Sequence, residues 1–162
     1  MFSNILSSDE IEQSQELLTL SQIGLDCVCR EQNFLLPAIQ VQRVLDFRPE
    51  DMRERRHDWS DFHYSSVSGD LPVCVLARVC GAAHVNGAPQ PNIVVLHADH
   101  DRFHGDWGLL VDQVRGLHPF GLSDVEPNGN STTIPASLVD RYVAAETGPR
   151  PVLKDLSEII IG

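Results

Sequence analysis

The sequence predicts an all-β protein, and two observations support that class. About nine or ten short apolar runs, rich in Val, Ile and Leu, are separated by frequent turn signals. Two of these runs, residues 93–96 and 107–111, flank a polar segment as the two arms of a hairpin would. A barrel architecture agrees with this strand count, although the count alone does not require it.

Composition bounds the domain organisation and the class of partner. The 162 residues are 42% hydrophobic, which suits one domain, or two packed subdomains, burying roughly 70% of the unfolded surface. The net charge is −11, and every basic residue except Lys154 is an arginine. Such a chain repels a phosphate backbone unless its arginines cluster, and the densest basic run, residues 53–57, is interleaved with acid. We therefore expect no nucleic-acid binding.

Localisation and redox state follow from two further patterns. The first residues lack a positive stretch followed by an apolar core, and no apolar run reaches about 18 residues. We therefore expect a cytoplasmic protein without membrane insertion. The cysteines do not have the paired spacing of zinc sites and are interpreted as reduced, buried thiols, with no cofactor expected. They are Cys27, Cys29, Cys74 and Cys80.

The N-terminal third begins with an acidic leader, residues 1–19. Ser7 and Glu10 have the spacing of a capping box, which predicts a helix there. Two interpretations stay open for it, a loosely docked or frayed segment and an amphipathic helix that binds a partner. Residues 20–30 and 34–47 predict two strands joined by a turn at 31–33, and Pro37 interrupts the second, with a further strand at 41–46.

The remaining chain alternates strands with connections. Residues 48–61 predict an exposed connection with a helical turn, and Trp59 and nearby Tyr64 suit an interface as well as a core. Residues 67–80 predict a strand followed by a short helix, and residues 82–91 a linker between two halves. The last third predicts a segment at 138–144 and a closing strand-to-helix element at 151–160.

Several segments together resemble a known family. The sequence reads NIVVL at 92–96, GLLVDQV at 108–114 and LSDVEP at 122–127, and the aromatic-led strand FLLPAIQVQRV precedes them at 34–44. Further matches are LPV at 71–73 and VLKDL at 152–156. In this order the segments resemble the CheW-type chemotaxis coupling domain over residues 20–161.

The resemblance implies both a fold and a function. The implied fold is two packed SH3-like five-stranded β-barrel subdomains with short helices, the chain crossing between them near residues 82–91. The implied function is that of a non-catalytic adaptor in a bacterial chemosensory system. Its implied partners are a CheA-type histidine kinase and a methyl-accepting chemoreceptor. The positions that match the partner-facing segments of the family are Val41, Arg43, Val44, Val67, Ser68 and Leu71.

The sequence departs from the family pattern at three of its polar positions. Val67 and Ser68 stand where the family carries an Arg-Gly pair. Arg43 occupies a place that is commonly acidic, and Val75 replaces the family's aspartate. These departures favour a divergent or auxiliary coupling protein, such as those that accompany type IV pilus chemosensory systems.

A histidine cluster offers an alternative function, metal binding or metal-dependent catalysis. His97, His100 and His104 lie in a run with three aspartates, and imidazoles with carboxylates suit zinc, copper, nickel or iron. Their spacing is co-facial only on a helix, whereas the flanking runs predict strands with this segment as their exposed turn. No G-x-S-x-G elbow or Gly-rich phosphate loop is present either. The sequence therefore predicts that the protein is not an enzyme.

Overall fold

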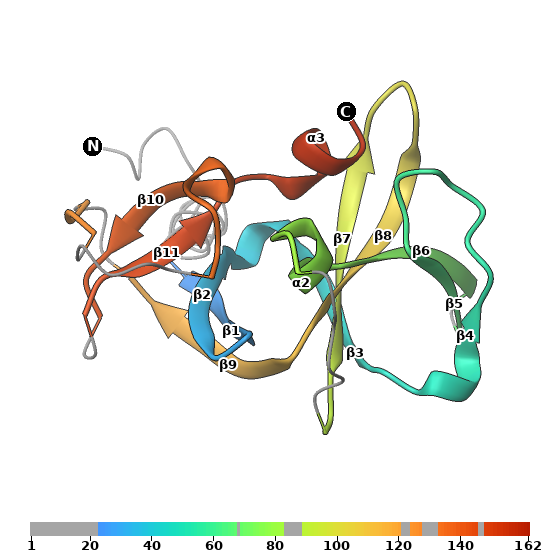
Figure 1. The fold of residues 1–162 in the computed structure, drawn as a ribbon, viewed down its shortest axis with the longest axis horizontal. Helices are drawn as coiled ribbons and strands as arrows, with labels where there is room; N and C mark the ends of the chain where they lie inside the picture. The colour runs from blue at the N-terminus through green and yellow to red at the C-terminus, as the bar shows by residue number, and fades with distance from the viewer. Residues whose placement is uncertain (1–22, 68, 83–88, 121–123, 128–132, 146–147) are drawn as a thin grey trace, which may run out of the picture.

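The computed structural model describes residues 23–67, 69–82, 89–120, 124–127, 133–145 and 148–162. The predicted leader, residues 1–19, and the predicted site residue Ser68 lie outside this set. The described residues form two β-sheets that lie side by side, with short helices between and beside them (Figure 1). The predicted class, an all-β fold of two packed units with short helices, is confirmed.

The first sheet, called sheet A, combines the two ends of the described chain. Its five strands have the order β10-β11-β2-β1-β9. All neighbours pair antiparallel except β11 and β2, which are parallel and place Val152 beside Leu35. The strands are β1 (Ile23–Cys29), β2 (Gln32–Pro37), β9 (Gln113–Pro119), β10 (Val139–Val143) and β11 (Arg150–Leu153).

The second sheet, called sheet B, contains the middle of the chain. It has the order β3-β7-β8-β6-β5-β4 and therefore six strands, one more than predicted, because the two-residue β4 adds an edge. The β7–β8 hairpin is its longest pairing, with residues 92–99 opposite 104–111. The strands are β3 (Val41–Asp46), β4 (Met52–Arg53), β5 (Phe62–Ser66), β6 (Gly69–Val75), β7 (Asn92–Asp99) and β8 (His104–Val111).

Short helices mark the ends of strands. The 3₁₀ turns η2 (Ala38–Gln40), η3 (Pro49–Asp51) and η4 (Ala136–Leu138) each follow or include a proline-led start. Helix α2 (Leu76–Val79) continues directly from β6, and α3 (Leu156–Ile160) follows β11. The Asp155 carboxylate caps α3 by accepting a hydrogen bond from the Ser157 amide at 3.1 Å. No helix in the described part of the chain is long and apolar enough to cross a membrane.

The β1–β2 hairpin shows how a tight turn is formed without glycine. Arg30 and Glu31 have φ angles of +51° and +70°, the backbone of a two-residue turn whose twist matches that of the strands. The Asp112 carboxylate accepts a hydrogen bond of 2.7 Å from the Arg30 amide, which holds this conformation. The turn lies one residue earlier than the predicted turn at 31–33.

The chain crosses between the sheets at two places, and neither is the predicted linker at 82–91. The strands that flank that linker, β6 and β7, both belong to sheet B. One crossing is η2, between β2 and β3, and the other is Asp112, between β8 and β9. The proline and glycine content of the linker marked a connection correctly, but composition does not say which strands a connection joins.

One hydrophobic core is shared by both sheets. It includes Leu25 and Phe34 from sheet A and Ile93, Trp107 and Leu109 from sheet B, with exposed fractions of 0–6%. Gly108 permits the close packing in sheet B, because a Cβ there would lie 2.8 Å from Leu71 Cδ1. A second, smaller apolar cluster lies apart from this core, on sheet A.

Candidate partner-binding surface

Three of the predicted contact residues lie together on β3, at one end of sheet B. In the sheet order β3 pairs only with β7, so among the described strands its other edge has no partner. Val41 and Arg43 are half-buried, whereas Val44 is 38% exposed. The register shifts between Val41 and Arg43, a bulge that breaks the regular ladder at this edge.

Arg43 belongs to a polar network on the face of the β7–β8 hairpin. Its guanidinium lies 3.7 Å from the Asp106 carboxylate, and His97 Nδ1 lies 3.1 Å from the other oxygen of that carboxylate. The Arg43 and Asp106 side chains are 36% and 40% exposed. The pair is therefore accessible to solvent, and an incoming carboxylate can compete with Asp106 for Arg43.

The other two predicted contact residues that the structure describes, Val67 and Leu71, differ in their exposure to solvent. Val67 is fully exposed at the β5–β6 turn and lines a surface pocket that also contains Leu45 and Asp46 of β3. The pocket thus connects the end of β3 to that turn. Leu71, in contrast, is only 3% exposed and packs in the core beside Gly108. Its prediction as a contact residue is corrected, because the apolar position that matched the family faces inward here.

The structure does not bring the three histidines of the metal hypothesis together. His97 and His104 are cross-strand neighbours whose rings lie 5.4 Å apart, and each places Nδ1 against a carboxylate, Asp106 or Asp99. His100 turns away and lies 3.2 Å from the hydroxyl of Ser157 in α3. Within the described ranges no group of three or more His, Cys, Asp or Glu side chains is arranged to hold a metal ion.

This segment was expected to be a turn, and it is mostly strand. β7 continues to Asp99 and β8 begins at His104, so the turn itself comprises only residues 100–103. Polar side chains alternate with Ala98 along β7, and Ala98 is buried. The sequence did not reveal these strand ends, because a strand with one solvent-exposed face can carry His and Asp at alternate positions.

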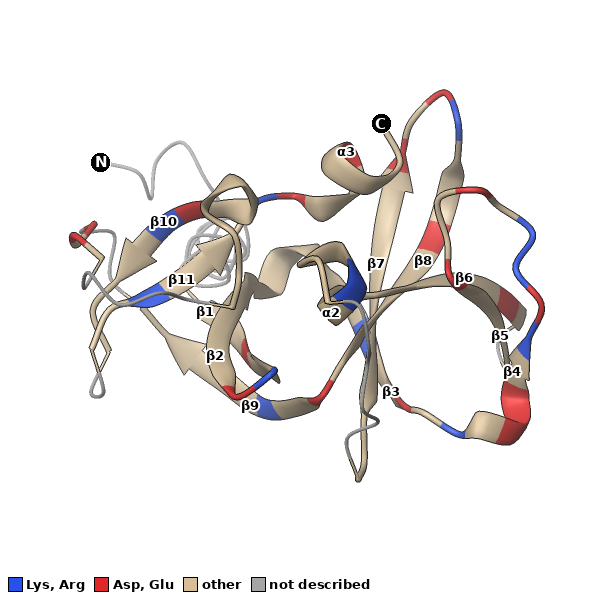
Figure 2. Ribbon diagram, in the orientation of Figure 1, with Lys and Arg blue, Asp and Glu red and all other residues tan. Residues whose placement is uncertain are grey.

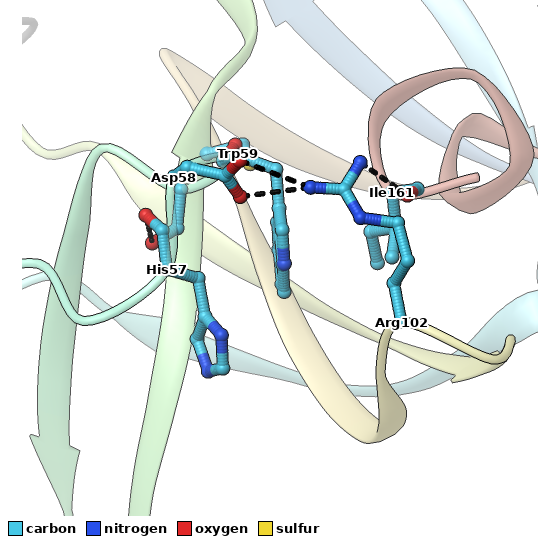
Figure 3. Close-up of polar contacts among 7 residues, drawn as sticks. His57, Asp58, Trp59, Arg102 and Ile161 are labelled. Atoms are coloured by element: carbon cyan, nitrogen blue, oxygen red, sulfur yellow. Dashed lines mark hydrogen bonds and ion pairs between the residues drawn. The ribbon is translucent and has the colours of Figure 1, made fainter.

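The tip of the hairpin carries a contact that sequence reasoning missed. Arg102 donates two hydrogen bonds to the Asp58 carboxylate, at 2.9 and 3.1 Å, and another of 3.1 Å to the backbone carbonyl of Ile161 (Figure 3). One side chain thereby ties together the hairpin tip, the loop before β5 and the end of α3. Its partners lie 44 and 59 residues away in sequence, so no local pattern could have revealed them.

Aromatic rings fill the space beneath this contact. His57 stacks between Trp59 and His63, at centroid distances of 5.2 and 5.5 Å, and Phe103 contacts both His57 and Trp59. Trp59 is half-buried in this group and packs edge-on against Trp107 at 6.3 Å. The core alternative for Trp59 is therefore the one the structure supports.

Tyr64 likewise has a core position. It is 3% exposed, and its hydroxyl donates to the Asp46 carbonyl and accepts from the Arg48 amide, both at 3.0 Å. The tyrosine thus holds the end of β3 against β5. This contact positions the strand that carries Val41, Arg43 and Val44.

The comparisons with known proteins agree with this arrangement of strands. The family model of the CheW-like domain matches residues 24–153. The chain belongs to the CheW-like domain family. No curated protein gives a significant match to the sequence.

A solved structure matches this CheW-like domain over most of its length. It is the crystal structure of the scaffolding protein TtCheW from Thermoanaerobacter tengcongensis, with a TM-score of 0.65 and 16% sequence identity. The match covers 83% of this chain and 85% of that chain. At this identity the likeness shows that the two proteins share a fold.

The thiols of this CheW-like domain are part of its interior. Cys27, Cys29 and Cys74 are 0–1% exposed, and Cys80 is half-buried. Burial raises the pKa of the Cys29 and Cys74 thiols to about 12, and it raises the pKa of Cys27 further. Because the thiolate is the reactive form, none of these three suits nucleophilic chemistry. The burial of Cys27, Cys29 and Cys74 agrees with the prediction, whereas Cys80 is only half-buried.

Several arginines of the described chain lie close to acidic side chains. In Figure 2 the segment after η3 alternates basic and acidic residues, and helix α2 carries an isolated arginine. That arginine, Arg78, lies 3.2 Å from the Asp61 carboxylate, and Arg56 lies 3.5 Å from Asp70. The run at 53–57 is thus a solvated surface in which acids lie close to the arginines, as the sequence indicated.

Proposed function

We propose that this protein is a non-catalytic adaptor in a bacterial chemosensory system. In this role it couples chemoreceptors to a CheA-type histidine kinase, or regulates that coupling, through protein contacts in the cytoplasm. Family membership supports the adaptor role, and so does the shared fold with a protein described as a scaffolding protein. Among the residues that the structure describes, no group of three or more His, Cys, Asp or Glu side chains is arranged to hold a metal ion, so the metal alternative has no geometric support there.

The observation that carries the choice of surface is the position of β3 at the end of sheet B. An edge strand presents backbone N–H and C=O groups that another chain can pair with. Apolar side chains accompany this edge, because Val44 is 38% exposed and Ile39 in η2 is 51% exposed. Backbone pairing would supply affinity there, and side chains on either side of it would supply specificity.

Arg43 gives this surface its charge preference. The chain as a whole is acidic, with a net charge of −11, yet the middle of β3 presents a guanidinium. A partner strand with a carboxylate at the matching position would exchange with Asp106, which lies 3.7 Å from Arg43. The family commonly has an acidic residue here, so we expect a partner whose own charge at this contact is the opposite of the usual one.

The test is binding between the purified protein and the CheA-type kinase and chemoreceptor encoded in the same genome, measured by titration calorimetry. Arg43→Glu should weaken the complex by about tenfold or more, since a close pair of opposite charges becomes a pair of like charges. Arg115→Glu, an exposed arginine on β9 of the other sheet, serves as the matched control and should bind as the wild type does.

Two results would count against the proposal. The adaptor role is wrong if the wild-type protein binds neither partner at concentrations of about 100 μM. The role stands but the surface is wrong if Arg43→Glu and Arg115→Glu bind equally well. Circular dichroism and thermal melting of both variants show whether any loss reflects unfolding instead of a lost contact.

A further inference from the structure

The second apolar cluster lies on the face of sheet A that is turned away from the shared core. It comprises Leu35, Phe120, Val143 and Val152. Side chains alternate between the two faces of a strand, and the neighbours Phe34, Leu36 and Leu153 belong to the shared core. Leu35 and Val152 therefore point to the opposite side, which we call the outer face of sheet A.

This outer face is covered, although a single sheet face would be open to water. Leu35 and Val143 are 0% exposed, Val152 is 1% exposed and Phe120 is 5% exposed. Leu35, Val143 and Val152 come from strands of sheet A and Phe120 from the chain just after β9, and these four side chains alone do not exclude water from one another so completely. Another layer must pack on them, and within the described ranges no helix or further strand is part of this cluster.

Charged side chains on the same face are also buried. Arg150 pairs in register with Val143, and Asp26 pairs with Leu35. The Arg150 guanidinium lies 3.2 Å from the Asp26 carboxylate, and the two side chains are only 10% and 17% exposed. An ion pair on an open sheet face is normally exposed to water, so the burial of this pair also indicates a covering layer.

We propose that residues 1–22 of this chain are the covering layer and dock on the outer face of sheet A. The segment leads directly into β1, which lies in the interior of sheet A, between β2 and β9. Twenty-two residues reach about 33 Å even as a helix, and five strands span only about 19 Å between the outermost two. The segment is thus long enough to cross the sheet.

The composition of the segment matches the face chemically. Besides Met1 it contains seven large apolar residues that can pack on the cluster, and it carries four acids and no lysine or arginine. The face presents arginines instead, with Arg150 in the buried pair and Arg141 lying over the Phe120 ring at 5.4 Å. The apolar residues are Phe2, Ile5, Leu6, Ile11, Leu17, Leu18 and Leu20.

The inference concerns a surface other than the β3 edge and does not depend on the adaptor role. Docking of the N-terminal segment would make the outer face of sheet A inaccessible to other proteins. It also decides between the two interpretations that the sequence left open for the leader. A segment held by this chain is not available as a separate partner-binding helix.

The experiment compares amide hydrogen exchange in the full chain with that in two double variants. Leu17→Asp with Leu18→Asp places two charges among the apolar residues, and Gln13→Asp with Gln15→Asp adds the same charge at polar positions. In the first variant the amides of β2 and β11 should exchange about tenfold faster or more, because the face becomes wet. The control should match the wild type. Equal exchange in all three proteins would overturn the proposal.

A second measurement keeps the test decisive if the apolar double variant does not fold. A nitroxide attached at Ser14→Cys, in a chain that also carries Cys80→Ser so that the label attaches at one site, should broaden the methyl signals of Leu35, Val143 and Val152. Signals that stay sharp would contradict docking. Light scattering identifies the competing occupant, since a second copy covering the face would double the molar mass and would make the burial of β2 and β11 depend on concentration.

Discussion

The guanidinium of Arg102 donates a 3.1 Å hydrogen bond to the backbone carbonyl of Ile161, and this contact joins the tip of the sheet B hairpin to the helix that follows sheet A. A second link runs in parallel, between His100 and Ser157 at 3.2 Å. The hairpin of sheet B and the helix that follows sheet A are thus held together by two contacts near the C-terminal end of the described chain. The relative placement of the sheets depends on these contacts as well as on the shared core.

Removing the arginine should loosen α3 without unfolding the protein. Arg102→Ala loses the bond to Ile161 and the pair with Asp58, whose side chain is 80% exposed and so contributes little. We expect a loss of about 1 kcal/mol in unfolding free energy and a fall in Tm of about 2–4 °C. Hydrogen exchange should rise selectively in α3. Arg55→Ala, at an exposed position, is the control. Unchanged exchange in α3 of the Arg102→Ala variant would show that the contact does not stabilise this helix.

Filling the space at Gly108 should strain sheet B. A Cβ there would lie 2.6 Å from Ile93 Cγ2, 2.8 Å from Leu71 Cδ1 and 3.0 Å from Val73 Cγ2. We expect Gly108→Ala to destabilise the fold by about 1–3 kcal/mol, measured by urea unfolding. Combining it with Ile93→Ala removes the nearest methyl group, so the double variant should lose less than the sum of the single losses. Simple additivity would mean that the strain lies elsewhere.

Acid should weaken the fold partly through His63. Its ring is 5% exposed, and burial, with help from Arg56 and His57, lowers its pKa below the ordinary value of 6.5. As the pH falls through 6.5 the unfolded chain takes up a proton before the folded one, so stability is lost until the folded pKa is passed. The unfolding free energy of His63→Gln should therefore fall less between pH 7.5 and 5.5 than that of the wild type. His118→Gln is the control. If His63→Gln lost as much unfolding free energy between these two pH values as the wild type does, this account would be wrong.

The four thiols should differ in their accessibility to reagents. Cys27, Cys29 and Cys74 are buried, whereas Cys80 is half-buried, and burial raises the pKa of all four thiols. At pH 8 a thiol-reactive chromophore should label one site per molecule first, and Cys80→Ser should remove that phase. All four should react together once the protein is unfolded in denaturant. A fast phase that survives in Cys80→Ser would show that a buried thiol is exposed by local opening.

Local patterns predicted the elements of this fold better than their partners. The runs at 93–96 and 107–111 do form a hairpin, and Pro37 does separate two strands. The allocation of strands to sheets was less accessible, because it depends on pairings such as Val152 with Leu35. Such a pairing leaves no periodic trace in either segment. The linker at 82–91 was misplaced between the sheets for the same reason.

The candidate surface shows the same division. Family resemblance located Val41, Arg43 and Val44 on one strand, and the structure places that strand at an edge. The resemblance could not tell that Leu71 faces inward, since an apolar position in a pattern serves core and contact equally well. Tyr64 was ambiguous because its buried hydroxyl finds backbone partners in another segment, at Asp46 and Arg48.

The order in which the strands of sheet A are synthesised affects how the new chain folds. Leu35 and its neighbour Val152 are 117 positions apart (152 − 35), so β2 emerges from the ribosome long before β11 exists. At about 5–20 residues per second, β2 waits for roughly 6 to 23 s before the strand that pairs with its free edge is made. Sheet B, whose strands are contiguous in the chain, can assemble during that interval. The nascent chain is therefore exposed to aggregation through its first hairpin, and a chaperone that shields residues 23–37 would act on the slowest part of its folding.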